Sequence, residues 1–251
     1  MNMNRKTVVA IAFSCLFTLI ISVRSLNSFK VVFCDVGQGA ATLIQLGSYQ
    51  VLIDVGPDSR VLTCIGRHIS YFDHTIETVI ISHNQKDHNG GLLSIFKKYK
   101  LKQVYGPAPK PSFLDTSQFT EVKNTVLLHQ NSLDITIHKA SQSSSSINDS
   151  ANVVTIKTPR QTIFLTSDIN GSELKGLMPT DTTILEVPHH GSKYGLYPDS
   201  LDLALPTLAV ISVGARNTYG HPSKEALDIL KAKNIAVWRT DTQGELEINL
   251  R

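Results

Sequence analysis

The segment SHNQKDHNGGL, from Ser82 to Leu92, carries the densest group of chemically active side chains in this sequence. It places His83, Asp87 and His88 within six positions, directly after the apolar run TVII. Imidazole nitrogens and carboxylate oxygens are ligands that Zn²⁺ takes, and Mn²⁺ suits sites richer in oxygen. Because the pattern HxxxDH followed by two glycines seldom arises by chance, we interpret it as a metal-binding segment that follows a strand.

Other polar residues also stand where apolar runs end. Asp168 ends QTIFLTSD, His189 and His190 follow TTILEVP, and His221 follows TLAVISVGARNTYG. In layered α/β domains, side chains at strand ends and in the loops beyond them meet at one edge of a sheet. Two metal ions close together at such an edge would favour hydrolysis at a phosphorus or carbonyl centre. The candidate metal ligands are His83, Asp87, His88, Asp168, His189, His190 and His221.

Asp54 and the isolated histidines have a plainer interpretation. Asp54 ends YQVLIDVG, and we expect it to organise the turn through Gly56 and Pro57. A structural or solvated role is expected for His68, His74, His129 and His138.

Short runs rich in Val, Ile, Thr and aromatic residues recur from Phe29 onward, which is typical of strands. Helical patterns lie between them at Arg60–Ile69, Leu92–Lys98, Gly171–Leu177 and Ser223–Lys231. This mixture predicts a layered α/β domain. We interpret the serine-rich stretch from Ser141 to Ser150 as a loop between two strands, so that residues 29–251 form one domain.

The first 28 residues differ from the rest. Arg5 and Lys6 precede Thr7–Val23, an uncharged and mostly apolar run of seventeen residues. This length lies at the short limit of a bilayer span, roughly 17–25 residues, and exceeds a signal-peptide core of about 7–15. Residues 1–28 are therefore either a signal peptide or a single membrane anchor. We expect the domain to lie outside the cytoplasmic membrane, either secreted or anchored.

Charge and cysteine content narrow the function less than the motifs do. A formal net charge of +3 is too small to indicate a surface for polyanions, so a case for nucleic acid must rest on a site. Cys34 and Cys64 suit either a disulfide in an oxidising compartment or two buried thiols. No protein partner can be inferred.

The order of the motifs resembles the metallo-β-lactamase-fold hydrolase domain of ComEC-type competence (DNA-uptake) proteins. The resemblance runs from about Phe29 to Leu250 and implies a four-layer αββα sandwich with a one- or two-metal site at the strand ends. It rests on DVGQG at Asp35–Gly39, LIDVG at Leu52–Gly56, SHNQKDHNGGL, FLTSDI at Phe164–Ile169, VPHHGSK at Val187–Lys193 and NTYGHPS at Asn217–Ser223.

The resemblance also implies a role for each candidate ligand. His83 would serve a first metal, while Asp87 and His88 would serve a second. Asp168 would bridge the two ions. Either His190 or its neighbour His189 would complete a coordination shell.

Further residues would face the substrate. His221 would be another ligand, or a partner for a phosphate and a proton. Ser192, Lys193 and Asn217 would line the substrate side, where Lys193 could meet a phosphate oxygen and an amide could donate to a developing oxyanion. The candidate catalytic residues are Asp87, Asp168, Lys193 and Asn217.

Two positions depart from the family pattern, which has a carboxylate or histidine in place of Gln85 and an aspartate in place of Ala40. A glutamine carbonyl is neutral and is a weaker ligand for a transition metal than imidazole or carboxylate. We therefore expect the first metal position to be weak or empty. Asp87, His88, Asp168 and a later histidine would hold one Zn²⁺ or Mn²⁺ at the second position.

The function favoured by these motifs is an exported metal-dependent hydrolase, a phosphodiesterase or nuclease that acts on DNA or a related phosphodiester. Gln85 and Ala40 favour instead a catalytically weakened or inactive module that binds through the same cleft. Hydrolysis of a small ester, amide or lactam is a third alternative, because one fold hosts many chemistries. One short apolar run cannot translocate DNA, so we expect a free-standing relative of the competence proteins rather than a channel.

Overall fold

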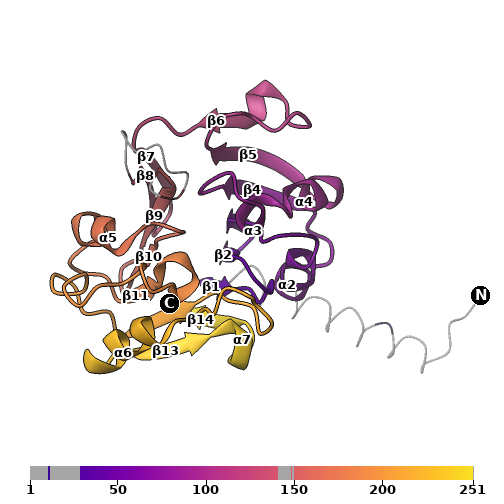
Figure 1. The fold of residues 1–251 in the computed structure, drawn as a ribbon. Helices are drawn as coiled ribbons and strands as arrows, with labels where there is room; N and C mark the ends of the chain where they lie inside the picture. Colours follow the sequence, from indigo (N-terminus) through magenta and orange to yellow (C-terminus); the bar gives the residue numbers. More distant parts are fainter. Residues whose placement is uncertain (1–10, 12–28, 141–147, 149, 251) are drawn as a thin grey trace, which may run out of the picture.

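The computed structural model describes Ile11, residues 29–140, Asn148 and residues 150–250 (Figure 1). The expected signal peptide or anchor, apart from Ile11, and most of the serine-rich stretch lie outside the described residues. Export and membrane attachment therefore stay predictions. Within the described part of the chain, no helix is both long and apolar enough to cross a bilayer.

Two seven-stranded sheets form the centre of the domain. The first sheet has the order β14 (Leu246–Asn249), β1 (Phe29–Phe33), β2 (Thr42–Leu46), β3 (Tyr49–Ile53), β4 (Thr75–Ile80), β5 (Lys100–Gly106) and β6 (Phe119–Glu121). The second has the order β13 (Ala236–Arg239), β12 (Leu208–Ile211), β11 (Ile184–Glu186), β10 (Thr162–Leu165), β9 (Asn152–Lys157), β8 (Leu133–Lys139) and β7 (Val126–Gln130). Both sheets are mixed. In the first sheet, neighbouring strands are antiparallel from β14 through β1 and β2 to β3, and parallel from β3 through β4 and β5 to β6. In the second sheet, neighbouring strands are antiparallel from β7 through β8 and β9 to β10, and parallel from β10 through β11 and β12 to β13.

The two sheets pack face to face because apolar side chains line both inner surfaces. Val31 and Phe33 of β1 belong to the same buried cluster as Ile163 and Leu165 of β10. The intervening residue Val32 belongs to a second cluster, on the outer face of its sheet. Full burial of one such side chain contributes about 1.5–3 kcal/mol to folding.

Helices cover the outer face of each sheet. α2 (Val61–His68) and α4 (Leu92–Lys98) pack on the first sheet, and α5 (Gly171–Leu177) and α6 (Lys224–Ala232) pack on the second (Figure 1). The result is the four-layer αββα sandwich predicted from the sequence. The short elements are α3 (Lys86–Asn89), α7 (Thr240–Gln243), and the 3₁₀ turns η1 (Thr116–Gln118) and η2 (Pro188–Gly191).

The four predicted helices are present, with ends that differ by no more than one residue from the predicted ones. Ser223 caps α6, since its hydroxyl accepts the Ala226 backbone N–H at 3.1 Å. The strands β6 and β7 were not predicted from the sequence. Each lies at the edge of a sheet, and every residue of both strands stays at least partly exposed, so the apolar pattern there is weak.

A disulfide joins Cys34, directly after β1, to Cys64 of α2, with Cα atoms 5.8 Å apart. The structure thus decides between the two states that the sequence left open. The bond ties α2 to the outer face of the first sheet, beside the loop from Asp35 to Ala40 that leads toward the candidate site.

Candidate metal centre

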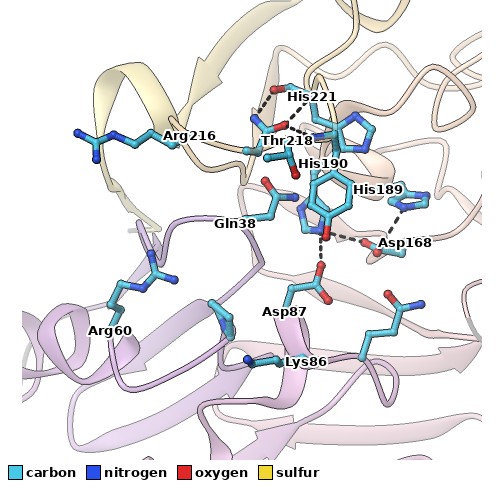
Figure 2. Close-up of a pocket in the computed structure, with 14 residues that line it drawn as sticks. Gln38, Arg60, Lys86, Asp87, Asp168, His189, His190, Arg216, Thr218 and His221 are labelled. Carbon is cyan, nitrogen blue, oxygen red and sulfur yellow. Dashed lines mark hydrogen bonds and ion pairs between the residues drawn. The ribbon is translucent and has the colours of Figure 1, made fainter.

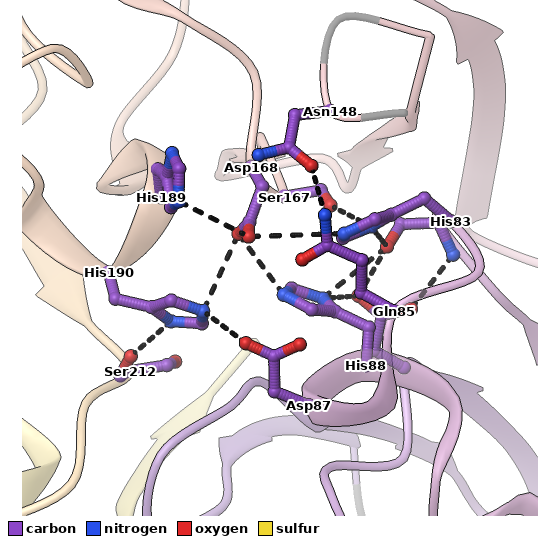
Figure 3. A network of polar contacts seen from close by, with 12 residues as sticks. His83, Gln85, Asp87, His88, Asn148, Ser167, Asp168, His189, His190 and Ser212 are labelled. Atoms are coloured by element: carbon purple, nitrogen blue, oxygen red, sulfur yellow. Dashed lines mark hydrogen bonds and ion pairs between the residues drawn. The ribbon is translucent and has the colours of Figure 1, made fainter. Parts of the chain in front are cut away.

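Six of the seven candidate ligands, all but His221, gather at the carboxyl ends of strands from both sheets (Figure 3). The segment after β4 supplies His83, and α3, which follows it, supplies Asp87 and His88. From the second sheet, the chain after β10 supplies Asp168 and the turn η2 after β11 supplies His190. The expectation that these separate segments meet at one edge agrees with this placement.

The backbone at η2 is unusual. His189, His190 and Gly191 have φ values of 51°, 55° and 79°, so three consecutive residues lie in the left-handed region. Such a conformation costs roughly 1–2 kcal/mol for each residue other than glycine, and such strain clusters at functional sites. Three backbone hydrogen bonds hold the turn. The His189 N–H donates to the Ser167 carbonyl at 2.9 Å, the Ser192 N–H to the His189 carbonyl at 2.9 Å, and the Ser223 N–H to the Gly191 carbonyl at 2.8 Å.

Four side chains form the core of the site: Asp87, His88, Asp168 and His190, whose ligand atoms all lie within 4.8 Å of one another. The His88 Nε2 atom lies 3.1 Å from Asp168 Oδ1, and the His190 Nε2 atom lies 3.5 Å from the same oxygen. Asp87 Oδ2 lies 3.4 Å from His190 Nε2. His88 and Asp168 are almost fully buried.

Hydrogen bonds at the far nitrogen orient both imidazoles. His88 Nδ1 donates to Asp54 Oδ2 at 2.6 Å, and His190 Nδ1 donates to the Ser212 carbonyl at 2.7 Å. In each neutral ring the proton is therefore on Nδ1, and the lone pair of Nε2 faces the carboxylates. Partners of this kind fix the tautomer and orientation of metal-binding histidines.

These residues fit a divalent cation. The buried atoms His88 Nε2, His190 Nε2 and Asp168 Oδ1 have no hydrogen-bond partner among the described residues. A neutral His88 ring carries its one N–H proton on Nδ1 and donates it to Asp54. Its Nε2 atom therefore has no proton to donate to Asp168 Oδ1, which lies 3.1 Å away. Lone pairs that face one another in a buried space are costly without a cation between them.

The pKa values of His88 and Asp168 likewise indicate that positive charge is favoured between these side chains. Burial would lower the pKa of His88, but Asp168 and Asp54 outweigh it and raise the pKa well above its usual value. Burial would likewise raise the pKa of Asp168, but His88 and His190 hold it well below its ordinary range. A proton or a metal ion can supply this positive charge. A set of two imidazoles and two carboxylates suits Zn²⁺ or Mn²⁺.

His83 stands at the edge of this group. Its Nε2 atom lies 3.9 Å from Asp168 Oδ2, and its Nδ1 atom lies 2.9 Å and 3.1 Å from the hydroxyls of Ser82 and Ser167. Burial, with a smaller effect of His88, lowers the pKa of His83 to about 4, so the ring is neutral at pH 7. Its buried Nε2 has no hydrogen-bond partner among the described residues.

The two departures from the family pattern, Gln85 and Ala40, make contacts of a different kind. The Gln85 amide nitrogen donates to the side-chain oxygen of Asn148, which lies between β8 and β9 (Figure 3). The Ala40 side chain is a buried methyl group; its backbone N–H donates to the Asp87 carbonyl at 3.2 Å, and its carbonyl accepts the Gly56 N–H at 2.9 Å. Neither position supplies a carboxylate or imidazole, and the weak first metal position stays a prediction.

The geometry favours His190 over His189 as the ligand, a choice that the sequence left open. His189 is one-third exposed, and its Nε2 atom lies 3.8 Å from Asp168 Oδ2, at the rim. His221 lies farther out, with its ring centroid 5.9 Å from that of His189. The roles of His189 and His221 as metal ligands stay predictions.

Two predicted substrate residues differ from the prediction, Lys193 in its position and Asn217 in its hydrogen bonds. The Lys193 ammonium lies over the Tyr194 ring, 4.8 Å from its centroid, and Lys193 is exposed and does not line the cavity above the site. Asn217 does line it, but its amide donates to the carbonyls of Gly214 and His221, and its oxygen accepts the N–H groups of Tyr219 and His221. Asn217 therefore organises its own loop rather than offering a donor to a substrate.

The structure corrects the interpretation of Asp54 as a simple turn residue. Asp54 is buried, with φ at 52°, and accepts hydrogen bonds from the Ser82 N–H, the Ser82 hydroxyl and His88 Nδ1.

Glu186, a buried acidic residue in β11, was not singled out from the sequence. Burial and the Asp54 charge raise the pKa of Glu186 to about 7. An acidic residue inside the apolar run TTILEV was the available signal.

An open cavity of about 420 Å³ lies above the site (Figure 2). Asp87, Asp168 and His190 contribute to its wall, and His189 and His221 lie along it. Its remaining charged residues are the cations Arg60, Lys86 and Arg216. The candidate metal centre is therefore accessible to a ligand from solvent.

Comparisons with known proteins agree with this fold. The family model described as metallo-beta-lactamase superfamily matches residues 34–215. Recombination protein 2 of Haemophilus influenzae is 26% identical over 242 residues, which cover 94% of this chain and 30% of that protein. ComE operon protein 3 of Bacillus subtilis is 27% identical over 190 residues, which cover 68% of this chain and 24% of that protein. The chain thus spans less than a third of the length of these relatives.

Among solved structures, the metallo-beta-lactamase fold protein YhfI from Bacillus subtilis aligns with a TM-score of 0.59 at 14% identity. The alignment covers 88% of this chain and 100% of that one. At this identity the likeness concerns the fold. The resemblance predicted from the sequence motifs is confirmed.

Proposed function

This chain belongs to the metallo-beta-lactamase superfamily. On that premise we propose that it is a metal-dependent phosphodiesterase that cleaves nucleic acid, with DNA as its main substrate. The observation that carries the proposal is the convergence of Asp87, His88, Asp168 and His190 beside an open cavity. The expected cofactor is one Zn²⁺ or Mn²⁺, held by these four side chains.

The charges around the cavity support a phosphodiester rather than a neutral substrate. Arg60, Lys86 and Arg216 line the same cavity as the metal-centre carboxylates. A phosphodiester is an anion, and cations on the wall favour its approach to a centre that holds Asp87 and Asp168. A neutral ester, amide or lactam would gain little from these three side chains.

When bound, a divalent cation supplies Lewis acidity that polarises a phosphoryl oxygen. The chain's own residues hold the arrangement, because Asp54 and the Ser212 carbonyl keep Nε2 of His88 and His190 directed inward. His221 lies on the cavity wall, and burial followed by the charges of His189 and His190 lowers its pKa. The ring is therefore neutral at pH 7 and able to accept a proton beside the substrate.

Hydrolysis by the full chain tests the proposal. Bis(4-nitrophenyl) phosphate and a labelled single-stranded DNA would be incubated with Zn²⁺, with Mn²⁺ and with a chelator. We expect cleavage with at least one metal, none with the chelator, and none by Asp168→Ala. Lys98→Ala, which removes an exposed cation outside the cavity, is the matched control and should stay active. Cleavage that survives Asp168→Ala would contradict the proposal.

A binding module without turnover is the second candidate. Gln85 favours it, because a neutral amide bonded to Asn148 stands where the family pattern has an ionisable ligand. Binding of DNA by the wild-type chain, with no hydrolysis in either metal, would select this candidate.

A further inference from the structure

The cavity above the metal centre adjoins a second, larger cleft. The second cleft has a volume of about 950 Å³, against about 420 Å³ for the first. The two share the lining residues Gln38, Arg60, Arg216 and Asn217, so one leads into the other. A small phosphodiester at the metal centre would leave the second cleft empty, whereas a polymer would extend into it.

Two arginines stand at the shared boundary, one from each half of the sandwich. Arg60 directly precedes α2, which covers the first sheet, and Arg216 lies in the loop after β12 of the second sheet (Figure 2). Both are exposed. The planar guanidinium presents several donors in a fork that matches phosphate oxygens, so this boundary suits a phosphate group.

The two arginines differ in whether a carboxylate compensates their charge. Arg60 Nε lies 3.0 Å from Asp58 Oδ1 and Arg60 Nη2 lies 3.1 Å from Asp58 Oδ2, so part of its charge is compensated. No carboxylate in the described parts of the chain pairs with Arg216. Arg216 is therefore the stronger anchor for an anion.

Carboxylates in the second cleft do not repel a polyanion strongly, because most of them are paired. Arg239 binds Asp241 through two nitrogens, and Arg67 and His68 bind Glu245. Asp35 is the remaining acid there, and its carboxylate accepts the Gly37 N–H at 3.1 Å.

An exposed aromatic ring stands at the mouth of the first cavity. Tyr219 lines the cavity and is 69% exposed, although the loop that carries it is held by the four hydrogen bonds of the Asn217 side chain. The ring stacks on His221, with centroids 5.9 Å apart and planes 18° from parallel. An exposed aromatic face of this kind is a platform for an unstacked nucleobase, which a single strand offers and a duplex does not.

We infer that a single-stranded nucleic acid lies across both cavities, with a base on Tyr219 and with phosphates beyond the metal centre on Arg216 and Arg60. This inference rests on the proposed function, which places one phosphate of the strand at Asp87, His88, Asp168 and His190. The chain then binds an oligonucleotide more tightly than a dinucleotide, and the second cleft accounts for the difference.

Equilibrium binding without turnover tests the inference. The full chain, in chelator, would be titrated against a fluorescent oligothymidylate of about 12 nucleotides, with a dinucleotide as competitor. Arg216→Ala should weaken oligonucleotide binding about 5–10-fold and reduce the slope of log Kd against log salt by about 0.7, as loss of one phosphate contact predicts. Dinucleotide binding should weaken less than oligonucleotide binding, because a dinucleotide does not extend into the second cleft. Arg216→Lys should recover most of the affinity, and Lys98→Ala should match the wild type.

Tyr219 supplies an independent arm of the test. Tyr219→Ala should weaken single-strand binding roughly 10-fold, as expected when one base loses its stacking partner, while Tyr219→Phe keeps the affinity. The wild-type chain should bind the same sequence more weakly as a duplex. Equal binding of single strand and duplex, or oligonucleotide affinity unchanged in Arg216→Ala, would overturn the inference.

The two proposals fail in different ways. If the binding pattern holds but neither metal supports hydrolysis, the proposed function fails and the inferred path of the strand stands. If the small diester is hydrolysed but Arg216→Ala and Tyr219→Ala bind like the wild type, the path is wrong and the proposed function stands.

Discussion

Asp54 influences the metal centre without belonging to it. Its carboxylate receives three hydrogen bonds, two from Ser82 and one from His88 Nδ1. The last of these decides which His88 nitrogen carries the proton, and therefore which one faces Asp168. Residues that orient a metal-binding histidine typically change metal affinity about 10–100-fold when replaced.

We predict that Asp54→Asn lowers the affinity for Zn²⁺ by about 10–100-fold, because an amide nitrogen replaces one of the accepting oxygens. Competition with a chromophoric chelator measures the affinity. Asp58→Asn is the control, since Asp58 is an exposed carboxylate that pairs with Arg60 outside the centre. An equal loss in both variants would show that Asp54 has no specific role.

The adjacent histidines of η2 provide a second prediction at the scale of single residues. His190→Ala should lose the bound ion, because its Nε2 lies within 3.5 Å of both Asp87 and Asp168. His189→Ala should keep the ion, because His189 is one-third exposed at the rim. Metal content of the two purified variants distinguishes them, and loss of the ion in His189→Ala alone would reverse the assignment.

The residue types of the site could be predicted from the sequence, but their orientations could not. Strand-end positions already grouped His83, Asp87, His88 and Asp168. The choice between His189 and His190 depends on consecutive left-handed residues, which no apolar period signals. The role of Asp54 was missed because an aspartate two residues before a Gly-Pro pair is explained equally well by a turn.

At the scale of elements, the disulfide from Cys34, directly after β1, to Cys64 of α2 restrains the start of the loop that carries Gln38. We predict that replacing Cys34 and Cys64 together by Ala lowers the free energy of unfolding by roughly 3–4 kcal/mol, as expected for a bridge across a separation of 30 residues. Urea denaturation measures the change. A loss below about 1 kcal/mol would show that the packing of α2 alone holds this edge.

Elements with a strong buried pattern were predictable, and exposed edges were not. α6 was predicted because a capping serine precedes a periodic apolar face, and α3 was missed because it spans only Lys86–Asn89. The edge strands β6 and β7 bury few side chains, so the alternation that marks a strand is faint in them. The packing of the two sheets against each other also depends on contacts between segments distant in sequence, which local patterns do not encode.

For the whole molecule, Glu186 links folding to pH. Burial, aided by Asp54, raises its pKa from 4.5 to about 7 in the folded chain. A raised folded pKa means that its contribution to stability is fully present below about pH 4.5 and is lost as pH rises toward 7, a change of roughly 3 kcal/mol.

We predict that Glu186→Gln, studied in chelator, removes this decline and is more stable than the wild type at about pH 8. Urea unfolding from about pH 5 to pH 8 measures the difference between the two chains. The advantage of the variant should grow across this range, because only the wild-type carboxyl must ionise while buried. Parallel stability profiles would show that Glu186 is already ionised in the folded state.

The most direct test of the central claim is the metal content of the full chain. Elemental analysis after incubation with Zn²⁺ or Mn²⁺ and removal of free metal should find one ion per chain. Asp168→Ala should hold none, and Lys98→Ala should retain the full amount. One ion lost only in Asp168→Ala would confirm a centre built by Asp87, His88, Asp168 and His190. No bound ion in the wild type, or equal binding by Asp168→Ala, would contradict it.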